Sequence, residues 1–249
     1  MKKLLCICAG ILLVAACAKK NDPVANVKEA AKDKDLQGTF TSDCQSKPID
    51  ASVAALFAAY ASLKSAANDQ QKNDQQKNDQ QKSNSANDTS KTAAGIPTHS
   101  TVSYNFTGAR VKKTTTLYTA EGCDKSKQAA IYEEDGTIDI DKGKKTNDGG
   151  YNINMDFKTL KANVTSAETA NIANGAHVCG VTDWAGGQKL RDVTANSKDI
   201  TCANTPEPRH VANIYRVDAG TLTLGTQTKG AVLDKDRPTS LENTKFHKQ

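Results

Sequence analysis

The chain has 249 residues, of which 37% are hydrophobic and only 5% aromatic, and it carries a formal net charge of +5. So few aromatic residues in a polar chain argue against a second large core, and we expect one folded domain. The basic excess is small and dispersed, and no basic run alternates with aromatic residues that could stack bases. These properties exclude a typical nucleic-acid-binding protein.

The first 16 residues have the features of a leader. Lys2 and Lys3 precede an apolar segment, residues 4–16, which is too short to span a bilayer as a helix and ends in small residues before a cysteine. This arrangement is typical of a secretory signal peptide. Its removal takes away two of the 33 basic residues and none of the 28 acidic ones, which lowers the net charge to +3.

The sequence Val14-Ala15-Ala16-Cys17 resembles the lipobox of bacterial lipoproteins. The resemblance implies that the leader is cut before Cys17 and that Cys17 is lipidated as the first residue of the mature protein. Several acyl chains anchor a protein stably, so the lipid would replace a transmembrane helix and the membrane is an expected partner. In the enterobacterial sorting rule an aspartate after the cysteine retains a lipoprotein at the inner membrane. Ala18 at this position therefore predicts the outer membrane.

A polar tether follows the cysteine. Residues 18–35 contain almost no large apolar side chain, so they cannot bury enough surface to fold by themselves. We expect the lipidated cysteine and this tether, residues 17–35, to connect the membrane to a folded domain at residues 36–249.

The domain begins with a predicted strand, residues 36–42, and then changes character. Asp50 can cap an alanine-rich helix at residues 51–67, with an apolar stripe at helical spacing. The stripe consists of Leu56, Phe57, Tyr60 and Leu63. Three copies of the pentapeptide Asn-Asp-Gln-Gln-Lys follow, at residues 68–72, 73–77 and 78–82. The copies have no apolar residue to pack, so we expect an insertion at about residues 50–98 whose repeats are disordered or extend the helix.

From Thr101 onward, apolar residues recur with a period of two, which predicts strands with one buried face. Gly108 marks a turn between two of these segments. The apolar members of the alternating segments are Val102, Tyr104, Phe106, Val111, Leu117, Ile138, Ile140, Tyr151, Ile153, Met155 and Phe157. The clearest segment, residues 151–158, is polar on one face and apolar on the other, as expected in an antiparallel sheet.

A non-strand interval at about residues 165–208 contains a short helix near residues 168–173. The last two predicted strands, residues 211–217 and 221–225, are joined by a strong hairpin signal at Asp218-Ala219-Gly220. Successive strands without crossover helices predict a mainly β fold, an antiparallel meander that closes as a barrel or curls as a sheet. Eight strands would just close around a filled or small-ligand interior.

The cysteines favour disulfides over zinc. Beyond Cys17, the cysteines of the mature chain are Cys44, Cys123, Cys179 and Cys202, in an oxidising compartment. No CxxC motif occurs, and the four histidines show no ligand spacing. Of the three possible pairings we favour Cys44 with Cys123 and Cys179 with Cys202, because neighbours in chain order cross-link most easily. Trp184 is either an exposed recognition residue or, as we favour, packs on the second disulfide.

Gly38-Thr39-Phe40 lies where the lipocalin family carries its Gly-x-Trp motif, with phenylalanine in place of tryptophan. The order of anchor, first strand, meander and late hairpin is similar to that of small lipocalin-like bacterial lipoproteins. Further segments resemble a group of uncharacterised secreted bacterial proteins. These segments are Cys179–Trp184, Val193-Thr194, Cys202, the strand of Tyr215, Leu222–Gly225 and Arg237–Leu241. The resemblance, over residues 36–44 and about 100–249, implies an up-and-down, lipocalin-like barrel of about eight strands.

Motifs of catalytic and metal sites are largely missing. The sequence contains no nucleophile elbow, zinc-protease motif, phosphate loop or kinase signature, so we expect neither enzymatic activity nor a cofactor. Asp139-x-Asp141-x-Gly143 is similar to part of a calcium loop, but adjacent lysines oppose the charge and the closing glutamate is absent. We therefore expect no metal site.

Two functional hypotheses follow. The first is a non-enzymatic binding module of the cell envelope that holds a small apolar ligand inside its barrel. The second is a structural or interaction protein of the envelope whose barrel is fully packed. The same inward side chains serve either as a cavity lining or as plain core, which we favour, and the sequence does not separate the two. These side chains are Tyr104, Phe106, Tyr151, Met155 and Phe157.

Overall fold

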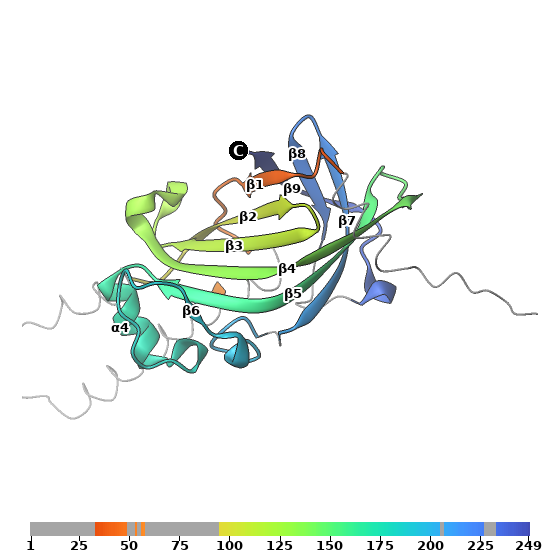
Figure 1. Cartoon of the computed structure of the whole chain (residues 1–249). Coiled ribbons are helices and arrows are strands. Elements are labelled where there is room, and N and C mark those ends of the chain that lie inside the picture. Colours follow the sequence, from red (N-terminus) through yellow and green to blue (C-terminus); the bar gives the residue numbers. More distant parts are fainter. Residues whose placement is uncertain (1–32, 49–52, 54–55, 58–94, 205–206, 227–232) are drawn as a thin grey trace, which may run out of the picture.

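Figure 1 shows a computed structural model of the chain, which describes residues 33–48, 53, 56–57, 95–204, 207–226 and 233–249. The predicted leader, Cys17, all but the last residues of the tether, the pentapeptide repeats and most of the predicted helix lie outside these residues. In the described part of the chain, no helix is long and apolar enough to cross a membrane.

Eight antiparallel strands close into a barrel, which confirms the predicted fold class. The barrel strands are β1 (Gly38–Ser42), β2 (His99–Thr107), β3 (Arg110–Tyr118), β4 (Gln128–Lys145), β5 (Tyr151–Val164), β7 (Arg209–Asp218), β8 (Thr221–Gly225) and β9 (Leu241–Lys248). Each strand pairs with its neighbour in chain order, except that β5 pairs with β7, and β9 closes the barrel against β1. The short strand β6 (Arg191–Asp192) pairs with the outer part of β5.

Within the described residues, helices are few and short. The only α-helix with described bounds is α4 (Ala167–Gly175), and Ser166 caps it by accepting a hydrogen bond from the Thr169 N–H. The 3₁₀ turns are η1 (Glu121–Cys123), η2 (Lys125–Lys127), η3 (Val178–Gly180), η4 (Thr194–Asn196) and η5 (Asp234–Asp236). In Figure 1, α4 lies at one end of the barrel, beside β6.

The period-two pattern of the sequence becomes the inner face of the barrel. Val102, Tyr104 and Phe106 of β2 are buried, and their intervening neighbours are not. Strand β4 runs unbroken for 18 residues and bends at a register shift between Asp135 and Gly136. A Cβ atom on Gly136 would lie 2.3 Å from the carbonyl oxygen of Asp156, so only glycine allows β5 to approach this closely.

Two buried apolar clusters fill the molecule. The first lies inside the barrel and includes side chains of all eight barrel strands, with Val111 as the contribution of β3. Leu36 and Val53 also belong to it. The second includes Trp184 and side chains of α4, β3, β4 and β5. Leu56 belongs to this second cluster and Phe57 packs against both, and both residues are helical, as the apolar stripe predicts. Tyr60 and Leu63 of the stripe lie outside the described residues.

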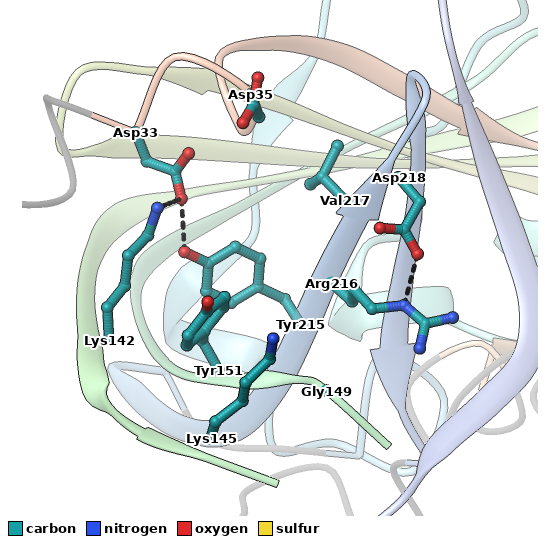
Figure 2. A pocket seen from close by; sticks show the side chains of 10 residues that line it. All are labelled: Asp33, Asp35, Lys142, Lys145, Gly149, Tyr151, Tyr215, Arg216, Val217 and Asp218. Carbon is teal, nitrogen blue, oxygen red and sulfur yellow. Dashed lines mark hydrogen bonds and ion pairs between the residues drawn. The ribbon is translucent and has the colours of Figure 1, made fainter. Parts of the chain in front are cut away.

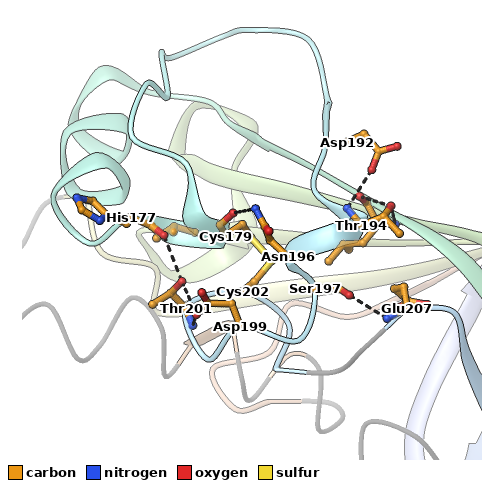
Figure 3. The surroundings of a disulfide bond; sticks show 12 residues. His177, Cys179, Asp192, Thr194, Asn196, Ser197, Asp199, Thr201, Cys202 and Glu207 are labelled. Carbon is orange, nitrogen blue, oxygen red and sulfur yellow. Dashed lines mark hydrogen bonds between the residues drawn. A yellow bond between two sulfur atoms is a disulfide. The ribbon is translucent and has the colours of Figure 1, made fainter.

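Two disulfides have the pairing that chain order favours. Cys44 is bonded to Cys123 and Cys179 to Cys202, with Cα–Cα distances of 5.6 and 4.4 Å. Figure 3 shows that Asn196 supports the second disulfide by donating a hydrogen bond of 2.8 Å to the carbonyl of Cys179. Trp184 is 5% exposed and lies in the same cluster as Cys179 and Cys202. It is therefore a packed residue, and not an exposed recognition aromatic.

Candidate functional site

A short strap, residues 33–37, holds one end of the barrel, which we call the mouth. The Asp33 carboxylate accepts hydrogen bonds from the hydroxyl of Tyr215 on β7, at 2.5 Å, and from Lys142 on β4, at 2.9 Å. The side chain of Gln37 accepts a hydrogen bond of 2.6 Å from the N–H of Gly108, in the turn between β2 and β3. Leu36 is fully buried in the barrel cluster, and its side chain anchors the strap to the core.

Asp33 is a buried carboxylate whose charge is neutralised locally. Burial raises the pKa of the Asp33 carboxyl, but the hydrogen bonds from Tyr215 and Lys142, the charge of Lys142 and the Leu36 N–H outweigh it. The net result is a pKa below the usual value, so the carboxylate is charged at neutral pH. Since Asp33 falls within the polar run that predicts a tether, the folded part begins earlier than the boundary at residue 36.

A pocket of about 270 Å³ opens beside the strap. Figure 2 shows Asp33 and Asp35 at its upper edge, Lys145 at its lower edge and the rings of Tyr151 and Tyr215 between them. The remaining lining residues are Lys142, Gly149, Arg216, Val217 and Asp218. The strap thus contributes carboxylates, whereas the end of β4 contributes the amines of Lys142 and Lys145.

Some of the charged groups that line the pocket already form ion pairs or hydrogen bonds within the protein. Arg216 donates from Nη1 to the carbonyl of Asp148, at 2.5 Å, and its Nε lies 2.6 Å from a carboxylate oxygen of Asp218. The ammonium groups of Lys142 and Lys145 lie 5.6 and 5.4 Å from the ring centre of Tyr151, within cation–π range. Among the residues that the structure describes, Lys145 has no carboxylate partner. The pocket can therefore donate hydrogen bonds to a ligand.

The five residues predicted as cavity lining or core separate into two groups. Tyr104, Phe106, Met155 and Phe157 are at most 3% exposed and belong to the barrel cluster. Their rings pack on one another and on neighbours: Tyr104 stacks on Phe106, with ring centres 6.0 Å apart, and meets Phe246 edge-on at 5.4 Å. Tyr151 lies at the mouth and lines the pocket there. Four of the five thus have the packing of a core.

A buried ionic network lies inside the barrel and has no counterpart among the predicted residues. Glu134 of β4 pairs with Lys113 of β3, at 3.4 Å, and with Arg209 of β7. Arg209 also pairs with Glu207, at 2.9 Å, and its guanidinium carbon lies 4.7 Å from the ring centre of Phe157. Burial raises the pKa of Glu207, Arg209 lowers it and the nearby Glu134 raises it, and the net result is a pKa of about 7.

The acidic residues of the partial calcium motif lie on strand β4 and do not form a loop. Asp139 is opposite Asn154 and Asp141 is opposite Asn152 in the register with β5, and Asp141 accepts a hydrogen bond of 2.8 Å from the Gly143 N–H. Within the described residues, no three histidine, cysteine, aspartate or glutamate side chains gather in a way that could hold a metal ion.

Comparison with known proteins adds no relative to this picture. No protein-family model matches the sequence, and no curated protein matches it. The function is therefore argued from the mouth and the interior of the barrel.

Proposed function

We propose that this chain is a lipid-anchored protein of the bacterial cell envelope that binds a ligand or partner at the mouth of its barrel and catalyses no reaction. The mouth pocket carries the proposal. It is the place where charged side chains, two tyrosine rings and open volume come together next to the strap.

The interior supports binding at the mouth over binding inside the barrel. Tyr104, Phe106 and Phe157 are in contact with neighbouring core side chains, and the ionic network of Glu134 and Arg209 occupies further interior space. An apolar ligand would have to displace these groups. The packed-barrel hypothesis therefore has more structural support than the hypothesis of an internal apolar ligand.

The position of the strap would place the mouth near the membrane. Fifteen residues lie between Cys17 and Asp33, which makes 16 Cα–Cα steps from one to the other. Fully extended they reach at most about 55 Å, and a flexible chain of this length averages about 22 Å. If Cys17 is lipidated, the pocket is thus held within a short distance of the bilayer, where it can sample molecules of the envelope.

The lining of the pocket supports a binding role without catalysis. Its described residues include no serine, threonine, cysteine or histidine, so they offer none of the pairs of hydroxyl or thiol nucleophile and histidine base that many hydrolases use. Asp33, the buried acid, is already held by a tyrosine and a lysine. This arrangement resembles a clamp that fixes the strap more than a proton-transfer pair.

Membrane fractionation tests the anchor and the outer-membrane location. We expect the wild-type chain in the outer-membrane fraction, Cys17→Ala in a soluble or uncleaved form, and Ala18→Asp at the inner membrane. Cys8→Ala, within the leader, is the matched control and should behave as wild type. Retention of Cys17→Ala in the outer-membrane fraction with a cleaved leader would contradict the proposal.

A further inference from the structure

We propose that the mouth pocket binds the anionic oxygen group, a carboxylate or a phosphate, of a small organic molecule, with Lys145 and Lys142 as the principal donors. This inference rests on the proposed function, because it names the class of ligand that the mouth would take. Some charged groups of the pocket already have ion-pair partners within the protein, whereas others can still bind a ligand, and this difference supports the inference.

Two of the three carboxylates that line the pocket already have ion-pair partners within the protein. Asp33 is 6% exposed and accepts hydrogen bonds from Tyr215 and Lys142. Asp218 is paired with Arg216. Asp35 is exposed on the strap and is the acidic group of the lining that remains for a ligand. The pocket therefore has little capacity to attract a cation.

The donors, in contrast, remain available. Lys145 is exposed and has three N–H groups, none of them in an ion pair within the described residues. Lys142 is 44% exposed at its side chain and uses one N–H toward Asp33, which leaves two. The ammonium groups of Lys142 and Lys145 lie 5.6 and 5.4 Å from the ring centre of Tyr151, and both residues line the pocket. Ammonium groups with N–H donors that the protein does not use favour an oxyanion as the ligand.

The other residues that line the pocket indicate the chemistry of the rest of the ligand. Val217 and the rings of Tyr151 and Tyr215 offer apolar surface, and Asp35 on the opposite edge can accept a hydrogen bond from a hydroxyl or ammonium group. A volume of about 270 Å³ holds roughly nine water molecules at ~30 Å³ each. The ligand is therefore a small acid with a hydroxyl or amine at its far end, free in solution or as the headgroup of a lipid.

Isothermal titration of the full-length protein in non-ionic detergent, with glycerol 3-phosphate as the probe, tests this inference. Glycerol is the matched neutral probe. We expect saturable binding of glycerol 3-phosphate alone, with Lys145→Ala weakening it ~10-fold to ~100-fold, the loss of one charge-assisted hydrogen bond. Lys145→Arg should retain binding, and Lys158→Ala, at an exposed lysine of β5, should leave it unchanged.

Mixed micelles distinguish the two sources of the anion. Competition by phosphatidylglycerol, and not by phosphatidylcholine, assigns the pocket to a lipid headgroup. Absence of competition assigns it to a free acid. The inference is overturned if glycerol binds as well as glycerol 3-phosphate, if neither binds, or if Lys145→Ala and Lys158→Ala have the same effect. Fractionation is independent of these results, so the anchor can stand while the ligand class fails.

Discussion

Glu207 allows the buried ionic network to be tested through pH. Its side chain is 0% exposed, and its pKa is raised from 4.5 to about 7 by burial, with Arg209 and Glu134 as the charged groups nearest to it and Lys113 beyond them. In the folded protein Glu207 therefore keeps its proton at a pH where the unfolded chain has lost it. The contribution of Glu207 to folding stability then falls as the pH rises from about 4.5 through 7, and the full difference corresponds to about 3 kcal/mol.

The replacement Glu207→Gln removes this dependence, because glutamine is neutral at every pH. Relative to wild type, we expect the variant to gain about 3 kcal/mol between pH 4.5 and pH 8. Urea unfolding at several pH values, followed by the fluorescence of Trp184, the only tryptophan of the chain, measures the difference. The exposed Glu121→Gln is the control and should show a nearly constant difference. A constant difference for Glu207→Gln, or one of opposite sign, would refute the reasoning.

Four other predictions concern folding stability, measured by urea unfolding for the substitutions and by thermal unfolding for the deletion. Arg209→Met leaves Glu134 buried without its main partner and should destabilise by about 3–5 kcal/mol, whereas Arg191→Met, in an exposed pair with Asp183, should change stability by less than about 1 kcal/mol. Cys179→Ser and Cys202→Ser should each lose about 3 kcal/mol, expose Trp184, and show no further loss when combined; additive losses would count against a shared bridge. Gly136→Ala should be strongly destabilising because its Cβ meets the Asp156 carbonyl, and unchanged stability would show that β5 can move away. Deletion of residues 68–82 should leave the melting temperature within a few degrees of wild type, and a larger drop would show that the repeats are docked.

Much of the barrel was predictable because apolar and polar residues alternate regularly along its strands. The period-two runs of Val102 to Phe106 and of Tyr151 to Phe157 became β2 and β5, with the expected residues buried except Tyr151, which lies at the mouth. Strand β9 escaped prediction because Phe246 is its only fully buried residue, so its sequence has no alternating apolar pattern. Its place in the barrel depends on pairing with β8, the strand before it, and with β1, which lies near the other end of the chain.

The site was less predictable than the fold. Asp33 lies in a polar run, and nothing local indicates that its carboxylate meets Tyr215, 182 residues away. Lys113 carried a usable signal, since it is two residues from Val111 and thus on the inward face of its strand. Glu207 precedes β7 in an irregular segment, where no period assigns a face. Charged groups that meet only through tertiary structure leave little trace in one sequence.

Native mass spectrometry of the protein, purified gently from membranes, tests the central claim most directly. We predict a chain that begins at Cys17 and carries acyl chains, with a small acidic molecule that is retained by wild type and by Lys158→Ala but lost from Lys145→Ala. An unacylated chain, or a retained apolar molecule that Lys145→Ala does not release, would contradict an anchored protein that binds its ligand at the mouth.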